Sequence, residues 1–341
     1  MNALGILTAG GDCPGLNAVI RGVVARAADR QGMDVVGVLD GWQGLMEGRT
    51  RRLDRDDVRG ILQRGGTILG TSRLDPYVHG DGYASVRRTV EANAIGTLVV
   101  VGGDGTLRTA LRLAEEGMQV VGVPKTIDND IPGTDVTFGF HTAVQIATEA
   151  IDRLTTTAEA HNRVMVVEVM GRTQGWLATY AGTASGADAI LVPEQPYDLE
   201  QTADILRARH RRGHRYSVVV VAEGVAPPPG TEWSPQTDAL GFERLGGVSY
   251  VVARRLEELT GFESRVTVLG HLQRGGTPCA FDRVLATRLG VAAADAAAAG
   301  ETGTMVALRC EQLVTVPLES ACAGIRGVPP DLLDVARTFH G

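Results

Sequence analysis

The chain has 341 residues, of which 44% are hydrophobic and 21% are charged, a composition typical of a globular protein and not of a disordered or fibrous one. Its length exceeds that at which one hydrophobic core usually stops growing, so two packed domains are expected. A formal net charge of -7 argues against a nucleic-acid or membrane partner, because binding to either requires a basic face. Any bound anion must therefore be held by locally placed groups.

The four cysteines show no C-x-x-C spacing, and a chain of this length does not need disulfides for stability. The first residues carry no basic segment followed by a long apolar run, and no stretch reaches membrane-spanning length. These features predict a cytoplasmic protein with reduced thiols.

Short apolar runs alternate with amphipathic stretches along the first half of the chain. Strands are predicted at residues 4–8, 35–39, 97–101 and 120–123, with helices at 17–29 and 107–116. Short β-branched runs that alternate with helices predict a mostly parallel sheet covered on both faces.

The second half repeats this alternation, with strands predicted at 164–169, 189–192 and 217–221. The proline-rich residues 226–236 predict a surface loop, and the alanine-rich residues 291–299 predict a helix. The expected fold class is therefore α/β, with two similar three-layer α/β/α domains and an active site in the cleft between them.

Two glycine-rich segments follow predicted strands. They are Thr8–Asn17, which contains Gly10, and Gly102–Thr106. Glycines let backbone N–H groups approach an anion closely, and such loops often precede a helix N-terminus. One glycine pair alone is equally compatible with a tight turn. Two at equivalent strand ends favour a phosphate site.

Neither segment matches the P-loop pattern G-x-x-x-x-G-K-[ST], so a nucleotide must be held differently. Asp104 lies inside the second glycine segment, where a carboxylate contacts a phosphate favourably only through a cation. This predicts a Mg²⁺ site at Asp104. The structural alternative is that Asp104 caps the following helix.

The segment Lys125–Asp130 follows another predicted strand and contains two carboxylates, a hydroxyl, an amide and the only lysine of the chain. Phosphoryl transfer needs a carboxylate that accepts the proton of the attacking hydroxyl, and cations that offset the charge of the transferred group. Asp128 is the candidate base, and Asp130 a candidate for indirect support of the metal. The alternative is a polar turn.

Further basic residues follow later strands. Arg172 comes after the strand 164–169, and Arg265, His271 and Arg274 lie within ten residues of one another. Guanidinium groups match the geometry of phosphate, so this group predicts capture of a second, non-reacting phosphate. In an arginine-rich chain, each residue taken alone is equally a surface charge.

Together these segments resemble the phosphofructokinase family. The matching strings are Gly10-Gly11-Asp12 with Pro14-Gly15-Leu16-Asn17-Ala18, then Gly102–Thr106, Thr126–Ile131, Met170-Gly171-Arg172 and Gly270–Gly276, in family order over residues 3 to 325. The resemblance implies ATP-dependent, Mg²⁺-assisted phosphorylation of fructose 6-phosphate at its 1-hydroxyl, a step of glycolysis.

The resemblance also implies roles for individual residues. Asp128 would accept the proton, with Thr126 and Arg172 near the transferring phosphoryl group and Asp104 at the magnesium. Donor contacts would come from Gly10, Arg73, Leu74, Gly103, Asp104, Gly105 and Thr106. Substrate contacts would come from Thr126, Ile127, Asp128, Arg163, Met170, Gly171, Arg172, Glu223, Arg265, His271, Leu272, Gln273 and Arg274.

In the family, arginines at the positions of Arg163 and Arg265 reach the site of a neighbouring subunit, so the resemblance implies a homodimer or homotetramer. It also implies a donor domain of residues 1–139 plus about 273–323 and a sugar-phosphate domain of residues 140–272 plus about 324–341.

The choice of donor is the main ambiguity. ATP-dependent members resemble G-G-D-G with P-G-T-I-D-N-D, and pyrophosphate-dependent members G-G-D-D with P-K-T-I-D-N-D. This chain has Gly105 from the first pattern and Lys125 from the second, as in an actinobacterial-like group. An aspartate at 105 would place bulk and negative charge where the α-phosphate of ATP must lie, so Gly105 predicts ATP. Pyrophosphate is the alternative.

The resemblance places an effector pocket near Arg21 and Arg55, but Thr155 and His214 stand where basic residues are expected, so classical regulation by ADP or phosphoenolpyruvate is doubtful. Other possibilities are a kinase for a longer ketose phosphate and a catalytically silent sugar-phosphate-binding regulator. NAD and diacylglycerol kinases share the G-G-D-G-T string but not T-I-D-N-D-I. A silent regulator would have lost Asp128, Asp104 or Arg172, and all three are present.

Overall fold

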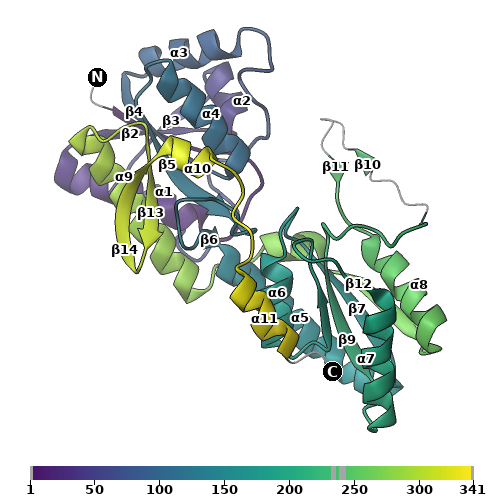
Figure 1. The fold of residues 1–341 in the computed structure, drawn as a ribbon. Coiled ribbons are helices and arrows are strands. Elements are labelled where there is room, and N and C mark those ends of the chain that lie inside the picture. Colours follow the sequence, from purple (N-terminus) through teal and green to yellow (C-terminus); the bar gives the residue numbers. More distant parts are fainter. Residues whose placement is uncertain (1–2, 232–235, 238–242, 339–341) are drawn as a thin grey trace. The chain divides into compact units, whose positions relative to one another are not determined.

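The structure is a computed structural model that describes residues 3–231, 236–237 and 243–338. The chain divides into two compact units (Figure 1). Unit 1 comprises Met1–Thr142 and Arg274–Arg326, and unit 2 comprises Ala143–Gln273 and Gly327–Gly341. The chain therefore passes between the units three times.

Unit 1 contains a sheet of eight described strands, ordered β14-β13-β5-β4-β1-β2-β3, with β6 paired to β5. Neighbours pair in parallel, except that β3 lies antiparallel to β2 and β14 antiparallel to β13. The strands are β1 (Ala3–Thr8), β2 (Asp34–Val38), β3 (Thr50–Leu53), β4 (Ile95–Gly102), β5 (Val120–Thr126), β6 (Phe138–Gly139), β13 (Thr304–Arg309) and β14 (Gln312–Pro317).

Strand β1 lies between β2 and β4, so the direction in which successive strands are added to the sheet reverses there. Thr8 at the end of β1 pairs with Val101, and Gly102 at the end of β4 pairs with Pro124 in β5. The carboxyl ends of β1, β4 and β5 consequently meet at one edge. This is the place where open α/β sheets bind ligands.

Helices cover both faces of this sheet. One layer contains α1 (Leu16–Arg26), which continues into a π-helical turn (Ala27–Gln31), and α9 (Ala280–Ala299). The other contains α2 (Gly41–Glu47), α3 (Gly82–Ala92), α4 (Asp104–Glu115) and α10 (Leu318–Cys322). A Cβ at Gly22 would lie 2.8 Å from the oxygen of Thr287, and one at Gly290 would lie 2.4 Å from the oxygen of Val19. Glycine at both positions is therefore what lets α1 and α9 pack so closely.

Unit 2 contains a four-stranded parallel sheet ordered β12-β7-β9-β8, and every residue of β7 and β9 is buried. Its strands are β7 (Val164–Val169), β8 (Ala189–Leu191), β9 (Ser217–Ala222) and β12 (Ser264–Val268). Its helices are α5 (Phe140–His161), which enters from unit 1, α6 (Trp176–Ala184), α7 (Leu199–Arg211), α8 (Val248–Thr260) and α11 (Pro330–Thr338). A short ladder joins β10 (Gln236–Thr237) to β11 (Glu243–Arg244), and a 3₁₀ helix covers Gly270–Arg274.

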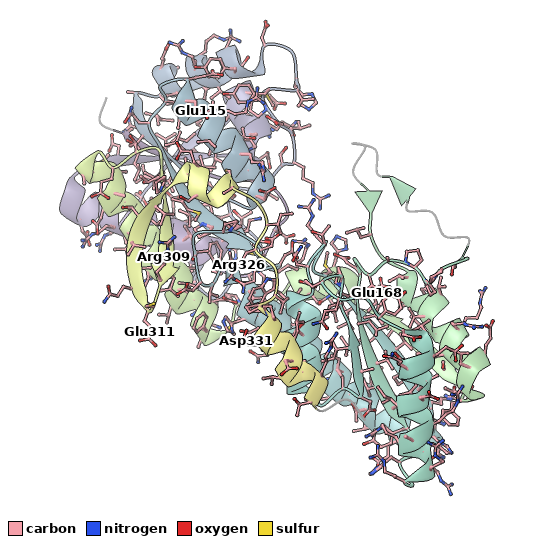
Figure 2. The ribbon with its side chains drawn as sticks, viewed as in Figure 1. Glu115, Glu168, Arg309, Glu311, Arg326 and Asp331 are labelled. Carbon is pink, nitrogen blue, oxygen red and sulfur yellow. The ribbon has the colours of Figure 1, made fainter. Side chains whose placement is uncertain are left out.

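Glu168 is a charged residue inside this second core, and its side chain is labelled in Figure 2. It is 1% exposed, and Oε2 accepts hydrogen bonds from the backbone nitrogens of Gly247 (2.9 Å) and Ser249 (3.0 Å) and from Oγ of Ser249 (2.6 Å). These donors belong to the start of α8. The carboxylate thus caps that helix, where a negative charge is favoured.

The expected α/β class is confirmed, with helices on mostly parallel sheets. Two predicted boundaries were wrong, because α4 begins at Asp104 and not at 107, and the helix predicted at 291–299 begins at Ala280. Of the predicted loop 226–236, residues 232–235 lie outside the described residues. No described helix is long and apolar enough to cross a membrane.

Candidate active site

The first glycine segment folds against the loop that carries Arg73 and Leu74. Gly10 has a left-handed backbone (φ 84°), and its nitrogen donates to the oxygen of Ser72 at 2.9 Å. Oγ1 of Thr71 donates to the oxygen of Gly10 at 2.7 Å. Segments some sixty residues apart in the sequence therefore form one surface beyond the end of β1.

The second glycine segment forms the start of α4. Gly103 is the N-cap and Asp104 the first helical residue, so the expectation that Asp104 itself caps the helix was wrong. Thr106 links the two segments, because its Oγ1 lies 3.3 Å from where a Cβ at Gly10 would stand. Apart from its chain neighbours and the backbone of its own helix, a Cβ at Gly105 would meet no described atom within 4 Å. The space beside Gly105 is therefore open.

Asp104 keeps its carboxylate at the beginning of α4, with its side chain 24% exposed. Its Oδ1 accepts a hydrogen bond from Nε of Arg108, one turn further along the helix, at 2.9 Å. This bond fixes the carboxylate next to the backbone N–H groups of the helix N-terminus, which favour anions.

Asp128 lies in a buried turn directly after β5. Its backbone nitrogen donates to Oγ1 of Thr126 at 3.0 Å, and the same hydroxyl donates to Oδ2 of Asp128 at 3.2 Å. The residue is 4% exposed, and Oδ1 has no hydrogen-bond partner within the described part of the chain. A buried carboxylate oxygen without a donor is available to accept one from a ligand.

The rest of this turn is tied down by side chains. Asn129 adopts a left-handed backbone (φ 52°), which asparagine tolerates better than most residues. Its Oδ1 accepts from the nitrogen of Thr137 at 3.0 Å, and Oγ1 of Thr137 donates to the oxygen of Thr126 at 2.9 Å. The neighbours Ile127 and Asp130 are also buried. Asp128 is therefore presented by a braced turn.

Lys125 is 3% exposed, and its ammonium group donates a hydrogen bond to the oxygen of Gly11. Burial lowers its pKa, and the nearby Arg274 guanidinium acts in the same direction, while Asp128 and Asp12 oppose the shift. The adjacent Cys13 thiol is fully buried, which raises its pKa to about 12 and leaves it protonated at neutral pH. The lysine is thus held against the first glycine segment.

Arg274 also reaches this segment. Its Nη1 donates to the oxygen of Asp12 at 3.1 Å and lies 2.9 Å from where a Cβ at Gly11 would stand. Although expected among the sugar-phosphate contacts, Arg274 thus packs over the donor-side loop of unit 1.

In unit 2, Met170, Gly171 and Arg172 follow β7 and adjoin Glu223, which follows the neighbouring strand β9. Oε1 of Glu223 accepts from the nitrogens of Gly171 (3.2 Å) and Arg172 (2.9 Å). Arg172 has a left-handed backbone (φ 52°) and an exposed side chain. The carboxyl ends of β7 and β9 thus carry four of the predicted substrate residues.

The residues of the 3₁₀ helix that were predicted to contact the substrate differ in their exposure. Leu272 is 70% exposed and His271 is exposed, whereas Gln273 is completely buried and its Nε2 donates to the oxygen of Gly270 at 3.2 Å. Gln273 therefore braces this turn, and its exposed neighbours are the residues available to a ligand.

Arg163 and Arg265 lie at the other end of the unit 2 sheet, at the beginnings of β7 and β12. Both bind Glu263: Nε of Arg163 lies 2.7 Å from Oε2, and Nη2 of Arg265 contacts Oε1. The hydrogen bond from Arg163, together with the charge of both arginines, lowers the pKa of Glu263. Two cations are thus held beside one carboxylate.

No group of three or more His, Cys, Asp or Glu side chains suited to a metal occurs among the described residues. A protein-only metal cage is therefore not what the described chain provides. Mg²⁺ needs none, because it usually binds through one or two carboxylates together with substrate phosphates and water. The carboxylate oxygens of Asp104 are of the type that this ion prefers.

Two residues of these networks were missed by the sequence analysis. Glu263 gathers the two arginines, and Arg326 donates to the oxygen of Asn129 from Nη2 (2.8 Å) and Nε (3.2 Å). Neither stands in a recognisable motif. The only sequence signal is that Glu263 lies two residues from Arg265.

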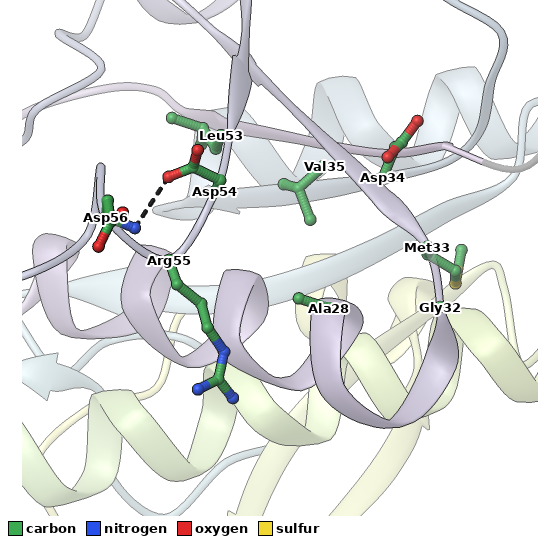
Figure 3. A pocket seen from close by; sticks show the side chains of 9 residues that line it. All are labelled: Ala28, Gly32, Met33, Asp34, Val35, Leu53, Asp54, Arg55 and Asp56. Carbon is green, nitrogen blue, oxygen red and sulfur yellow. Dashed lines mark hydrogen bonds between the residues drawn. The ribbon is translucent and has the colours of Figure 1, made fainter.

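Arg55 and Thr155, two of the residues compared with the family's effector pocket, have described surroundings. Arg55 forms an ion pair with Asp29 and lines a hollow of about 560 Å³ together with Asp34, Asp54 and Asp56 (Figure 3). Because Arg55 is already paired and three further carboxylates line the same hollow, a phosphate ligand is not favoured there. Thr155 bonds to its own helix through the oxygen of Ile151.

The model of the family "Phosphofructokinase" matches residues 3–297, and the chain belongs to this family. The chain is 52% identical to a pyrophosphate–fructose 6-phosphate 1-phosphotransferase of Amycolatopsis methanolica and 51% identical to an ATP-dependent 6-phosphofructokinase of Mycobacterium leprae, each match covering 99% of both chains. Among solved structures it is similar to Pichia pastoris phosphofructokinase (TM-score 0.83, 33% identity), covering 99% of this chain and 36% of the yeast chain.

Proposed function

We propose that this protein transfers the γ-phosphoryl group of ATP to the 1-hydroxyl of fructose 6-phosphate, with Asp128 as the base. The observation that carries the proposal is the buried carboxylate of Asp128, whose Oδ2 is fixed by Thr126 and whose Oδ1 has no partner among the described residues. Such a group can orient a hydroxyl and accept its proton as attack proceeds. Family membership supplies the reaction class.

In this mechanism Asp128 takes the proton of the attacking hydroxyl on Oδ1. Thr126 keeps the carboxylate in place, and the guanidinium of Arg172 offsets negative charge on the transferring group. Asp104 would hold a Mg²⁺ ion, which supplies charge neutralisation at the donor phosphates when bound. Asp130 would support that ion indirectly, and the N–H groups from Gly103 to Thr106 would receive the donor phosphates.

The donor is argued from the space beside Gly105. A Cβ there would meet no atom of the described structure within 4 Å, so glycine is not required for packing, and the space is available to a ligand. This open space is what favours a donor longer than pyrophosphate. Lys125 contacts the first glycine segment and leaves this space clear. Relatives of nearly equal similarity bear either donor in their names, so pyrophosphate remains the alternative that the assay must exclude.

The sugar phosphate is assigned to unit 2. Glu223, Met170, Gly171 and Arg172 lie at the carboxyl ends of β7 and β9, with His271 and Leu272 exposed on the 3₁₀ helix. Arg274 would assist from the donor side.

Arg163 and Arg265 would serve a second copy of the chain. Strand β7 has six residues, so about 20 Å of extended backbone separates Arg163 from Arg172. One phosphate cannot contact both ends of that strand. Arginines at the opposite end of the sheet therefore favour a homo-oligomer in which they complete a neighbour's substrate site.

The test is a donor panel of ATP, GTP, ADP and pyrophosphate with fructose 6-phosphate and Mg²⁺, run on the purified protein and on Asp128→Asn. We expect turnover with ATP that disappears with a chelator, and a loss of at least about 1,000-fold in the variant. Turnover with pyrophosphate alone would overturn the donor assignment. Normal turnover by Asp128→Asn would overturn the assignment of the base.

A further inference from the structure

Arg326 makes an unusual set of contacts at the end of unit 1 (Figure 2). Its guanidinium donates two hydrogen bonds to the oxygen of Asn129, and its backbone nitrogen donates to the oxygen of Asp130 at 2.8 Å. Three hydrogen bonds from one residue thus reach two consecutive carbonyl groups. Those carbonyls directly follow Asp128.

The turn that receives these bonds depends on such partners. Asn129 and Asp130 are buried (2% and 7% exposed), and buried carbonyl groups need hydrogen-bond donors. Strand β5 ends at Thr126, so the carbonyl groups of Asn129 and Asp130 lie beyond the sheet ladder. Arg326 supplies the donors that the sheet would otherwise provide.

The partners of the turn bind it through different groups. Thr126 and Thr137 bind the carboxylate of Asp128 and the side chain of Asn129. Arg326 binds the main-chain oxygens of Asn129 and Asp130. Because both the side chains and the main chain of the turn are fixed, Asp128 has a defined place.

Arg326 is itself fixed within unit 1 through its main chain, because its nitrogen donates to the oxygen of Asp130 at 2.8 Å. A guanidinium whose own backbone is bound to the turn is suited to hold the neighbouring carbonyl of Asn129. The chain that follows enters unit 2, where the nitrogen of Val328 donates to Oε1 of Glu194 at 3.3 Å.

We propose that Arg326 is a positioning residue that sets the placement of Asp128 for proton acceptance; this inference rests on the proposed function of Asp128. A base must come within about 2.6–3.2 Å of the proton's heavy atom, and a displacement of about 1 Å can cost 100-fold in rate. Arg326 has no part in the proton transfer. It acts through the backbone of residues 129 and 130.

The test compares Arg326→Ala and Arg326→Lys with the control Arg309→Ala. Arg309 also donates through Nε to a main-chain oxygen of this region, that of Gly133 at 3.0 Å, but lies outside the base turn. We expect kcat of Arg326→Ala to fall roughly 10- to 100-fold, with KM for fructose 6-phosphate changed less than about twofold. Arg326→Lys offers one donor nitrogen in place of the Nε and Nη2 pair and should be intermediate, and the control should match the wild type.

A double variant separates positioning from a general structural effect. If Arg326 acts through Asp128, adding Arg326→Ala to Asp128→Asn should not reduce the residual rate further, because the group being positioned is already gone. An additive loss would overturn the proposal. Melting temperatures of all variants are recorded. If Arg326→Ala is unfolded at the assay temperature, the decision rests on Arg326→Lys. A normal kcat of Arg326→Lys would then overturn the proposal.

The two proposals fail in different ways. Normal turnover by Asp128→Asn would refute both the assignment of Asp128 as the base and the positioning role of Arg326. An inactive Asp128→Asn with a fully active, folded Arg326→Ala removes this inference alone.

Discussion

Arg163 and Glu263 approach each other across neighbouring strands, with Nε of the arginine 2.7 Å from Oε2 of the carboxylate. The other oxygen of Glu263 binds Arg265. The hydrogen bond that Glu263 accepts from Arg163 comes from Nε and not from a terminal nitrogen of the guanidinium. The carboxylate therefore orders both arginines, and it also offsets their mutual repulsion.

Glu263→Gln should weaken binding of the sugar phosphate without affecting chemistry. An amide holds one guanidinium less firmly and no longer compensates the two positive charges. We expect KM for fructose 6-phosphate to rise roughly three- to tenfold, with kcat and KM for ATP unchanged, as measured by steady-state kinetics. Glu258→Gln, which removes a carboxylate that pairs with Arg255 on α8, is the matched control. A lower KM in Glu263→Gln would mean that Glu263 competes with the phosphate.

Gly105→Asp should change the donor. The backbone there is not left-handed and the site is open, so the fold should tolerate the substitution and melt normally. Two like charges about 4 Å apart repel by about 4 kcal/mol at an effective dielectric of 20, so kcat/KM for ATP should fall at least about 100-fold. Gly105→Ala adds bulk without charge and should lose much less. Equal losses in both variants would show that volume alone decides.

Lys125→Arg should reduce both stability and turnover. The ammonium group occupies a fully buried place beside Gly11, and a guanidinium is larger and needs more donors satisfied. We expect a loss of about 1–3 kcal/mol in the free energy of unfolding and at least about a tenfold fall in kcat. Lys125→Met keeps the volume and removes the charge. If it unfolds like the wild type but is inactive, the charge serves the reaction.

Asp282→Asn should alter how stability depends on pH. Burial raises the pKa of Asp282, which accepts hydrogen bonds from the nitrogen (2.7 Å) and Oγ1 (2.6 Å) of Thr142. The folded state therefore holds this proton more tightly than the unfolded state, whose aspartate pKa is about 3.9. The resulting stability is complete below that pH and is lost as pH rises through the folded pKa.

The melting temperature of the wild type minus that of Asp282→Asn should consequently decrease from about pH 4 toward neutral pH. Thermal melts at closely spaced pH values measure this difference. A difference that stays constant over the range would contradict the raised pKa.

The elements and much of the candidate site could be predicted because their signals are local. Valine-rich runs gave β4, β7 and β9 to within two residues, and the glycine segments and the Asp128 turn follow strands as expected. The start of α4 was missed because Gly105 is a weak helix former inside the first turn, where the helix is stabilised by packing. The start of α9 was missed for the same reason, because Gly290 is a weak helix former inside it, although glycine there is required for contact with α1.

Arg326 and Glu263 could not be predicted for a different reason. Arg326 meets Asn129 across 197 residues of sequence, and Arg163 meets Glu263 across 100. In a chain with 33 basic residues, nothing local distinguishes these arginines from the rest. Their partners are set by strand order and by the return of the chain to unit 1.

The return of the chain to unit 1 also bears on how the protein emerges from the ribosome. Strand β13 pairs with β5, but it belongs to residues made after the whole of the segment Ala143–Gln273. During synthesis, β6 can pair early with the end of β5, but the β5 edge at Val121 and Gly122 stays open until more than 160 further residues have been added. An open apolar edge invites pairing with other chains. Nascent chains that stall before β13 should therefore be the species most in need of a chaperone.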